Sequence, residues 1–94
     1  MRVVFSANLI HSGRHYTGGY VTKEVKMSFV PSIDMTIEGL GLEKPCKVLN
    51  VVVDVEGIKY DAYVNVSDIG CPTEEDLNAM IEHLRATGWL VFGH

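Results

Sequence analysis

The chain has 94 residues, of which 47% are hydrophobic and 21% are charged, so it is too apolar for a disordered protein and long enough for one core but not two. Its formal net charge of −4, without a cluster of lysine or arginine, argues against a nucleic-acid partner because the protein would repel phosphate. We therefore expect a single domain over residues 1–94.

Three further features of the sequence bear on where in the cell the protein is found. No apolar stretch approaches the roughly 18 residues of a membrane span. Ser6, Asn8 and His11 interrupt the N-terminal apolar segment, which argues against a secretory signal. The two cysteines, Cys46 and Cys71, are too few for a disulfide scaffold. The sequence therefore predicts a cytoplasmic protein with free thiols and no membrane partner.

The first half of the chain has the alternating pattern of β-strands. Residues 2–10 and 20–30 are expected to form a hairpin, and a shorter strand is expected over 33–37 after Pro31. Residues 11–19 contain three glycines and no alternation, which indicates a loop. The expected core face of the first strand consists of Val3, Phe5, Ala7 and Leu9.

A second hairpin is predicted from residues 46–55 and 58–67 around a two-residue turn, Glu56-Gly57. This register places Val53 opposite Tyr60 and opposes apolar to apolar side chains along one face. A slip of one residue would oppose apolar to polar side chains throughout.

Helical spacing begins near residue 73. Thr73 is a good N-cap, acidic residues follow it, and Gly88 is a natural stop, so an amphipathic helix is expected over about residues 74–87. Its buried stripe is Leu77, Met80, Ile81 and Leu84. Residues 89–92 are expected to form a short strand, with Trp89 and Phe92 packed beneath the helix.

These elements predict an α+β fold: a mainly antiparallel sheet of five to six strands with one C-terminal helix, arranged as two layers or a half-barrel. One helix covers only one face of such a sheet, yet the predicted strand over residues 46–55 is apolar on both faces. We expect Val48, Val52 and Tyr63 to share the second face and to form the interface of a homodimer. The alternatives are a sheet that curls over itself and isolated surface valines.

The glycine-rich loop is the first candidate ligand site. His11, Arg14, His15 and Tyr16 combine glycine N–H groups, a guanidinium for a carboxylate or phosphate, and histidines near their titration range. The spacing matches no phosphate-binding loop, and a solvated hairpin loop remains the alternative. No metal site and no cofactor are predicted.

Cys71 is the second candidate, as a reactive thiol. A helix N-terminus lowers a thiol pKa, but the three acids that follow Cys71 raise it. A small semi-buried spacer is the competing interpretation.

No catalytic motif is present, and the sequence names no specific function. The leading hypothesis is a small self-associating interaction module that binds another protein or a small ligand. The alternative is a small enzyme with a site at a dimer cleft, which would use Arg14 and His15 or Cys71.

Overall fold

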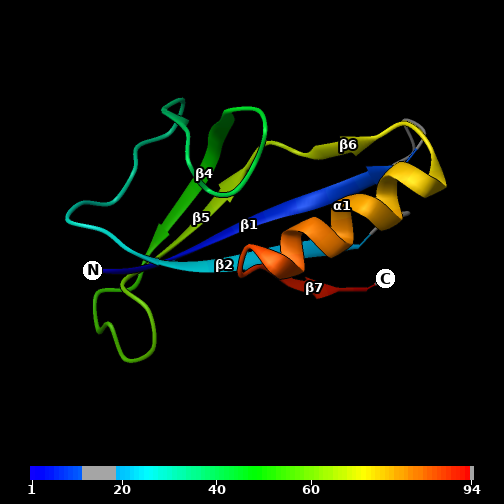
Figure 1. Cartoon of the computed structure of the whole chain (residues 1–94). Helices are drawn as coiled ribbons and strands as arrows, with labels where there is room; N and C mark the ends of the chain where they lie inside the picture. The colour runs from blue at the N-terminus through cyan, green and yellow to red at the C-terminus, as the bar shows by residue number, and fades with distance from the viewer. Residues whose placement is uncertain (12–18, 94) are drawn as a thin grey trace.

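The computed structural model describes residues 1–11 and 19–93 of the chain. Over these residues it forms a small α+β fold with one sheet and one helix (Figure 1). No helix in this part is long and apolar enough to cross a bilayer. In chain order the elements are β1 (Arg2–His11), β2 (Tyr20–Lys26), β3 (Thr36–Ile37), β4 (Cys46–Val53), β5 (Ala62–Val66), β6 (Ile69–Cys71), α1 (Glu74–Ala86) and β7 (Leu90–Phe92).

Strand β1 organises the sheet, whose order is β3-β4-β5-β1-β2-β7. β2 pairs with it antiparallel, as the predicted first hairpin requires. On its other side β5 pairs parallel with Val3–Ser6, and β6 pairs parallel with Leu9–His11. The predicted α+β class is confirmed, whereas β6 and both parallel pairings were not predicted, because they join segments about 60 residues apart.

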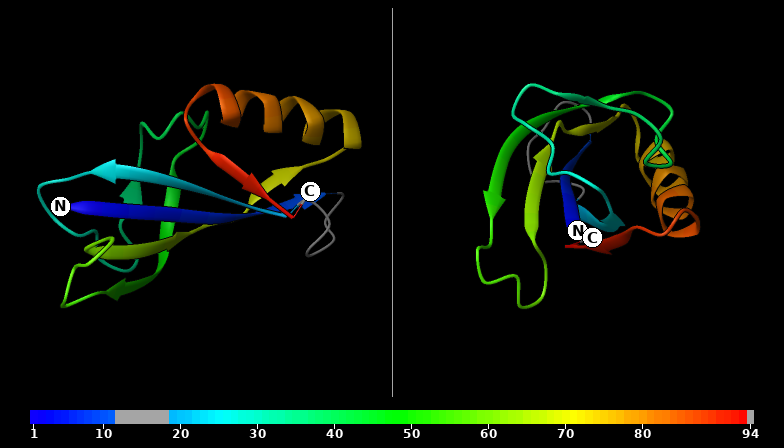
Figure 2. Two further views of the ribbon diagram at one scale, coloured as in Figure 1. Left: turned by 90° about the horizontal axis from the view of Figure 1, so that it is seen from below. Right: turned by 90° about the vertical axis from the view of Figure 1, so that its left-hand side faces the viewer.

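The helix covers one part of the inner face of the sheet, as Figure 2 shows. The four predicted core residues of β1 are all buried, and they lie beneath the buried helix positions Leu77, Ile81 and Leu84. Full burial of each of these side chains other than Ala7 stabilises the fold by roughly 1.5–3 kcal/mol. The sequence pattern therefore identified this half of the core, except that Met80, which was expected in the buried stripe, is only partly buried.

The segment of residues 27–45 covers the rest of the inner face. Pro31 and Leu40 are buried there, and Met35 and Leu42 pack against the same core. The indole Nε1 of Trp89 donates a hydrogen bond to the Leu40 carbonyl at 2.9 Å, which joins this segment to the C-terminal part of the fold. The sheet curls but does not close into a barrel. The segment of residues 27–45 covers the part of the inner face that the helix leaves open.

Both ends of α1 agree with the prediction. Thr73 Oγ1 accepts a hydrogen bond from the Asp76 amide at 3.1 Å, and the helix ends at Ala86, before Gly88 with its φ of 96°. The Nζ of Lys23, on β2, donates to the carbonyl of Thr87 at 2.7 Å. A lysine of the sheet therefore caps the negative end of the helix dipole.

The predicted two-residue turn of the second hairpin is wrong. Val53 pairs with Ala62 instead of Tyr60, and residues 54–61 form the connection. Glu56 does not adopt the positive φ that the first position of a primed turn requires. Instead, Asp61 binds β1, because the Arg2 amide donates to its Oδ2 at 2.7 Å.

A bulge at Leu49 overturns the predicted common face of Val48 and Val52. The register shifts between Val48, which pairs with Val66, and Asn50, which pairs with Asn65. The extra residue reverses the alternation, so Val48 joins the core with an exposed fraction of 0% while Val52 stays on the outer face.

Other boundaries differ by a few residues. β2 ends at Lys26 and β3 shrinks to two residues, because most of the segment of residues 27–45 leaves the sheet to cover it. In the C-terminal strand Trp89 is buried as predicted, whereas Phe92 is partly exposed on the outer face and stacks on Tyr20.

Candidate functional site

The predicted ligand site in the glycine-rich loop falls outside the described residues, since Arg14, His15 and Tyr16 lie in the range 12–18. The backbone of His11 is described, and it pairs with Cys71 at the end of β1. The fold therefore brings together the backbones of two candidates that lie 60 positions apart in the chain. Ligand binding by this loop stays a prediction.

The Cys71 thiol is buried and free of any disulfide. Desolvation by burial raises its pKa above the ordinary value of 9.0, and the negative charge of Asp76 raises it further. Burial and the Asp76 carboxylate thus act against the helix dipole, which on its own would lower the pKa of the thiol. At neutral pH the protonated thiol predominates, which is a poor nucleophile.

A groove of about 460 Å³ lies between β6, the start of α1 and the segment before β4. Its wall includes Cys71 and Met80, and its polar groups are Glu43, Asp76 and His83. These three polar side chains are exposed, and His83 Nε2 already contacts the Gly41 carbonyl at 2.7 Å. Among the described residues no group of three metal-ligating side chains gathers. The groove offers volume but no buried polar group that would orient a ligand.

The outer edge of β4 is the third candidate site. β3 pairs only with Cys46 and Lys47, and the backbone of Val48 still exchanges hydrogen bonds with Asp34 and Met35. Beyond Val48, no strand of residues 1–11 or 19–93 pairs with this edge. In Figure 2 β4 lies on the opposite side of the molecule from α1, so the helix does not cover it.

The hydrogen-bond alternation of an antiparallel pair fixes which backbone groups face the edge. The Asp54 amide donates to the Asp61 carbonyl at 2.9 Å, so this pair is hydrogen-bonded, and Val52 with Tyr63 is the next one. Val51 and Val53, the neighbours of Val52 on either side, direct their N–H and C=O groups away from β5. These groups form a template for another strand.

Apolar side chains surround this template on both faces of the hairpin. Val55 is 95% exposed and Ile58 78% exposed in the connection that follows β4, and Val52 is 54% exposed on the outer face. Leu49 and Val53 are also more than half exposed. We call these five side chains and the backbone edge of residues 49–53 the β4 edge. These exposed apolar side chains make the β4 edge a candidate interaction surface.

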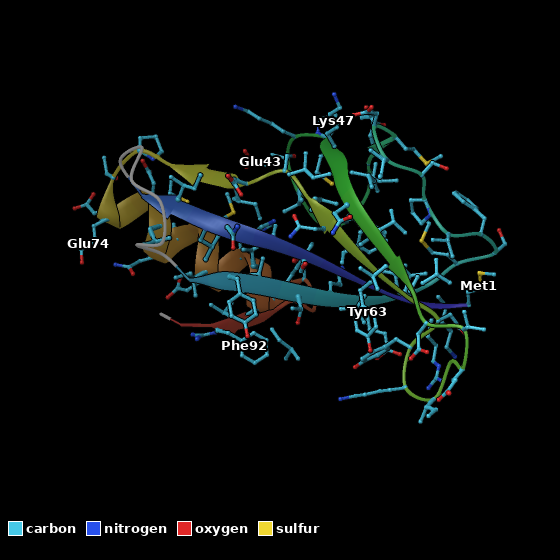
Figure 3. All side chains as sticks on the ribbon, turned by 180° about the vertical axis from the view of Figure 1, so that it is seen from behind. Met1, Glu43, Lys47, Tyr63, Glu74 and Phe92 are labelled. Carbon is cyan, nitrogen blue, oxygen red and sulfur yellow. The ribbon has the colours of Figure 1, made fainter. Side chains whose placement is uncertain are left out.

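The outer face of the sheet continues from the β4 edge (Figure 3). Register places Val52, Tyr63 and Val4 in one row across β4, β5 and β1. Of the three predicted interface residues, Val52 and Tyr63 therefore lie side by side and exposed, whereas Val48 lies in the core.

The sequence predicted the apolar surplus of residues 46–55 but not the unpaired edge. Natural proteins place prolines and charged residues on edge strands to prevent pairing with other chains. Residues 48–53 contain neither, and this was the sequence signal for an edge that can pair. The predicted tight turn implied a hairpin, but a hairpin by itself does not indicate which of its two strands lies at the edge of the sheet.

Comparison with known proteins gave no assignment: no family model matches the chain, and neither the curated proteins nor the solved structures include a significant match.

Proposed function

We propose that the protein is a cytoplasmic interaction module that binds an extended strand along the β4 edge. The observation that carries this proposal is the unpaired, apolar edge of residues 49–53. Strand addition obtains affinity from main-chain hydrogen bonds and specificity from alternate side chains. Two free, buried cysteines are compatible with a reducing compartment.

The alternative of a thiol enzyme receives less support. The raised pKa of Cys71 keeps its thiol protonated, and the adjoining groove has no buried polar group among its described lining residues. The part of that hypothesis that uses Arg14 and His15 stays a prediction for residues outside the described range.

Val53→Pro tests strand addition without disturbing the internal ladder. Proline is tolerated on edge strands where the lost N–H faces outward, and the Val53 N–H faces outward here. We expect the variant to remain folded, as reported by the fluorescence of buried Trp89, but to lose binding of a fluorescent peptide that copies residues 48–55 between solubilising lysines.

Val53→Thr is the matched control, because it keeps the N–H and a β-branched side chain and should retain peptide binding. Fluorescence anisotropy measures peptide binding by the unmodified protein and by both variants. Each protein is first diluted until its sedimenting mass no longer changes, so that self-association does not cover the β4 edge. Equal peptide affinity in a folded Val53→Pro variant would rule out strand addition at this edge.

A further inference from the structure

We propose that the strand bound at the β4 edge is β4 of a second copy of this chain, related by a two-fold axis that passes beside Val52. This inference rests on the proposed strand addition and names its partner. A two-fold axis perpendicular to a sheet pairs an edge strand with itself in antiparallel orientation, so the same surface serves both copies. The proposal requires that β4 be complementary to its own reversed sequence.

The outward backbone groups limit the possible registers. Only Val51 and Val53 present their N–H and C=O groups to the edge within the regular part of β4. Pairing Val51 with Val53 of the second copy satisfies both residues in both copies. It also places the two copies of Val52 directly opposite each other at the axis, as a non-hydrogen-bonded pair.

This register matches side chains on each face of the joined sheet. Val51 meets Val53 on the inner face, and Val52 meets itself on the outer face. Asn50 lies opposite Asp54, where the amide can donate to the carboxylate. One step further along, Leu49 comes beside Val55, the most exposed of the five apolar side chains of the β4 edge.

A neighbouring register of the symmetric pair is less favourable. It pairs Val51 with itself and so opposes Asn50 to Val52, an amide to an apolar side chain, twice in the symmetric pair. It also brings Asp54 opposite Val48, whose outward backbone groups already bond Asp34 and Met35. The segment before β3 would have to detach to admit the second strand.

The exposed apolar side chains of the β4 edge provide more than half of the area that each partner buries in a standard dimer interface. The five apolar side chains of the β4 edge, each at least half exposed, present on the order of 500 Å², against about 800 Å² per partner in a standard interface. The backbone of residues 49–53 and the exposed part of Tyr63 add to this area. The row of Val52, Tyr63 and Val4 would then continue across both copies.

Cysteine cross-linking tests the partner and the register together. In the proposed dimer Val52→Cys places two thiols in a non-hydrogen-bonded pair about 4.5 Å apart at Cα, within disulfide range. We expect this full-length variant to form a covalent dimer under mild oxidation. The native thiols do not compete, because Cys46 and Cys71 are buried.

Asn50→Cys is the matched control on the same outer face and is similarly exposed. Its two thiols would lie four residues apart along the pair, roughly 13 Å, so it should not cross-link. Cross-linking of both variants at equal rates would indicate random collision and overturn the proposal. Cross-linking of Val51→Cys in place of Val52→Cys would overturn the register.

Sedimentation of the unmodified protein separates failure of this inference from failure of strand addition. A dimer that dissociates in Val53→Pro and persists in Val53→Thr supports both. A monomer at all accessible concentrations that still binds the strand peptide overturns the second copy as partner and leaves strand addition standing. A monomer that binds no peptide overturns both.

Discussion

Both cysteine thiols are held in their protonated form by their surroundings. Burial raises the pKa of Cys46, although its backbone hydrogen bond opposes this, and burial together with Asp76 raises the pKa of Cys71. Each thiol also fills space in the core, which is the usual role of a buried free cysteine. The raised pKa values of the two thiols therefore make the stability of the fold depend on pH.

We expect the free energy of unfolding to fall as the pH rises above about 9. In the unfolded chain both thiols ionise near 9.0, whereas the folded protein keeps them protonated to a higher pH. The unfolded state thus releases protons that the folded state retains, and alkaline pH favours unfolding. Urea unfolding between pH 8 and 10.5 measures this slope.

The double variant Cys46→Ala, Cys71→Ala supplies the comparison, because it lacks both thiols and keeps every other ionisable group. Its absolute stability will be lower, since two core side chains shrink. Its loss of stability across the alkaline range should be smaller than that of the unmodified protein. Identical slopes would show that the thiols titrate alike in the folded and unfolded states.

At the scale of elements, Lys23 links β2 to the C-terminal end of α1. Lys23 lies on the core side of β2, between Val21 and Val25, in a strand whose pattern would otherwise place an apolar residue there. Its ammonium group reaches the Thr87 carbonyl and lies 6.0 Å from the centre of the Trp89 ring. The lysine stem crosses apolar surface while its charge meets the end of the helix.

Lys23→Met should lower the free energy of unfolding by about 1–2 kcal/mol, because it removes a charged hydrogen bond at the helix terminus and keeps most of the apolar stem. Lys26→Met, on the exposed outer face of the same strand, should change it by less than about 0.5 kcal/mol. Chemical denaturation followed by Trp89 fluorescence measures both. Equal effects of the two substitutions would contradict a cap by Lys23.

At the scale of the whole molecule, Trp89 joins the three parts that enclose the core. It follows α1, precedes β7, and donates to the Leu40 carbonyl in the segment of residues 27–45. Its side chain is among the largest that are fully buried. This one residue therefore couples the helix and the edge strand to the covering segment.

Trp89→Phe should lower the free energy of unfolding by about 2–4 kcal/mol, because it leaves the Leu40 carbonyl without its donor and a cavity where the indole was. Urea denaturation followed by circular dichroism measures this without the lost fluorophore. Leu90→Thr, at an exposed neighbouring position, is the control and should cost about 0.5 kcal/mol or less. A cost for Trp89→Phe no larger than that would contradict the coupling.

The sequence by itself determined the features that depend on neighbours along the chain. The alternation of β1, the ends of α1 and the helical stripe of Leu77, Ile81 and Leu84 follow from side-chain period and capping chemistry, and the structure confirms them. The sequence also predicted that residues 46–55 carry more apolar surface than one helix covers.

Only the tertiary structure decided where that surface lies. The Leu49 bulge sends Val48 to the core and leaves Val52 outside, and Asp61 binds Arg2 of β1 in place of a tight turn at Glu56. Both results depend on contacts between strands that are distant in the chain, which no local period encodes. The position of β4 at the border of the sheet, and with it the candidate site, follows from the same long-range pairing.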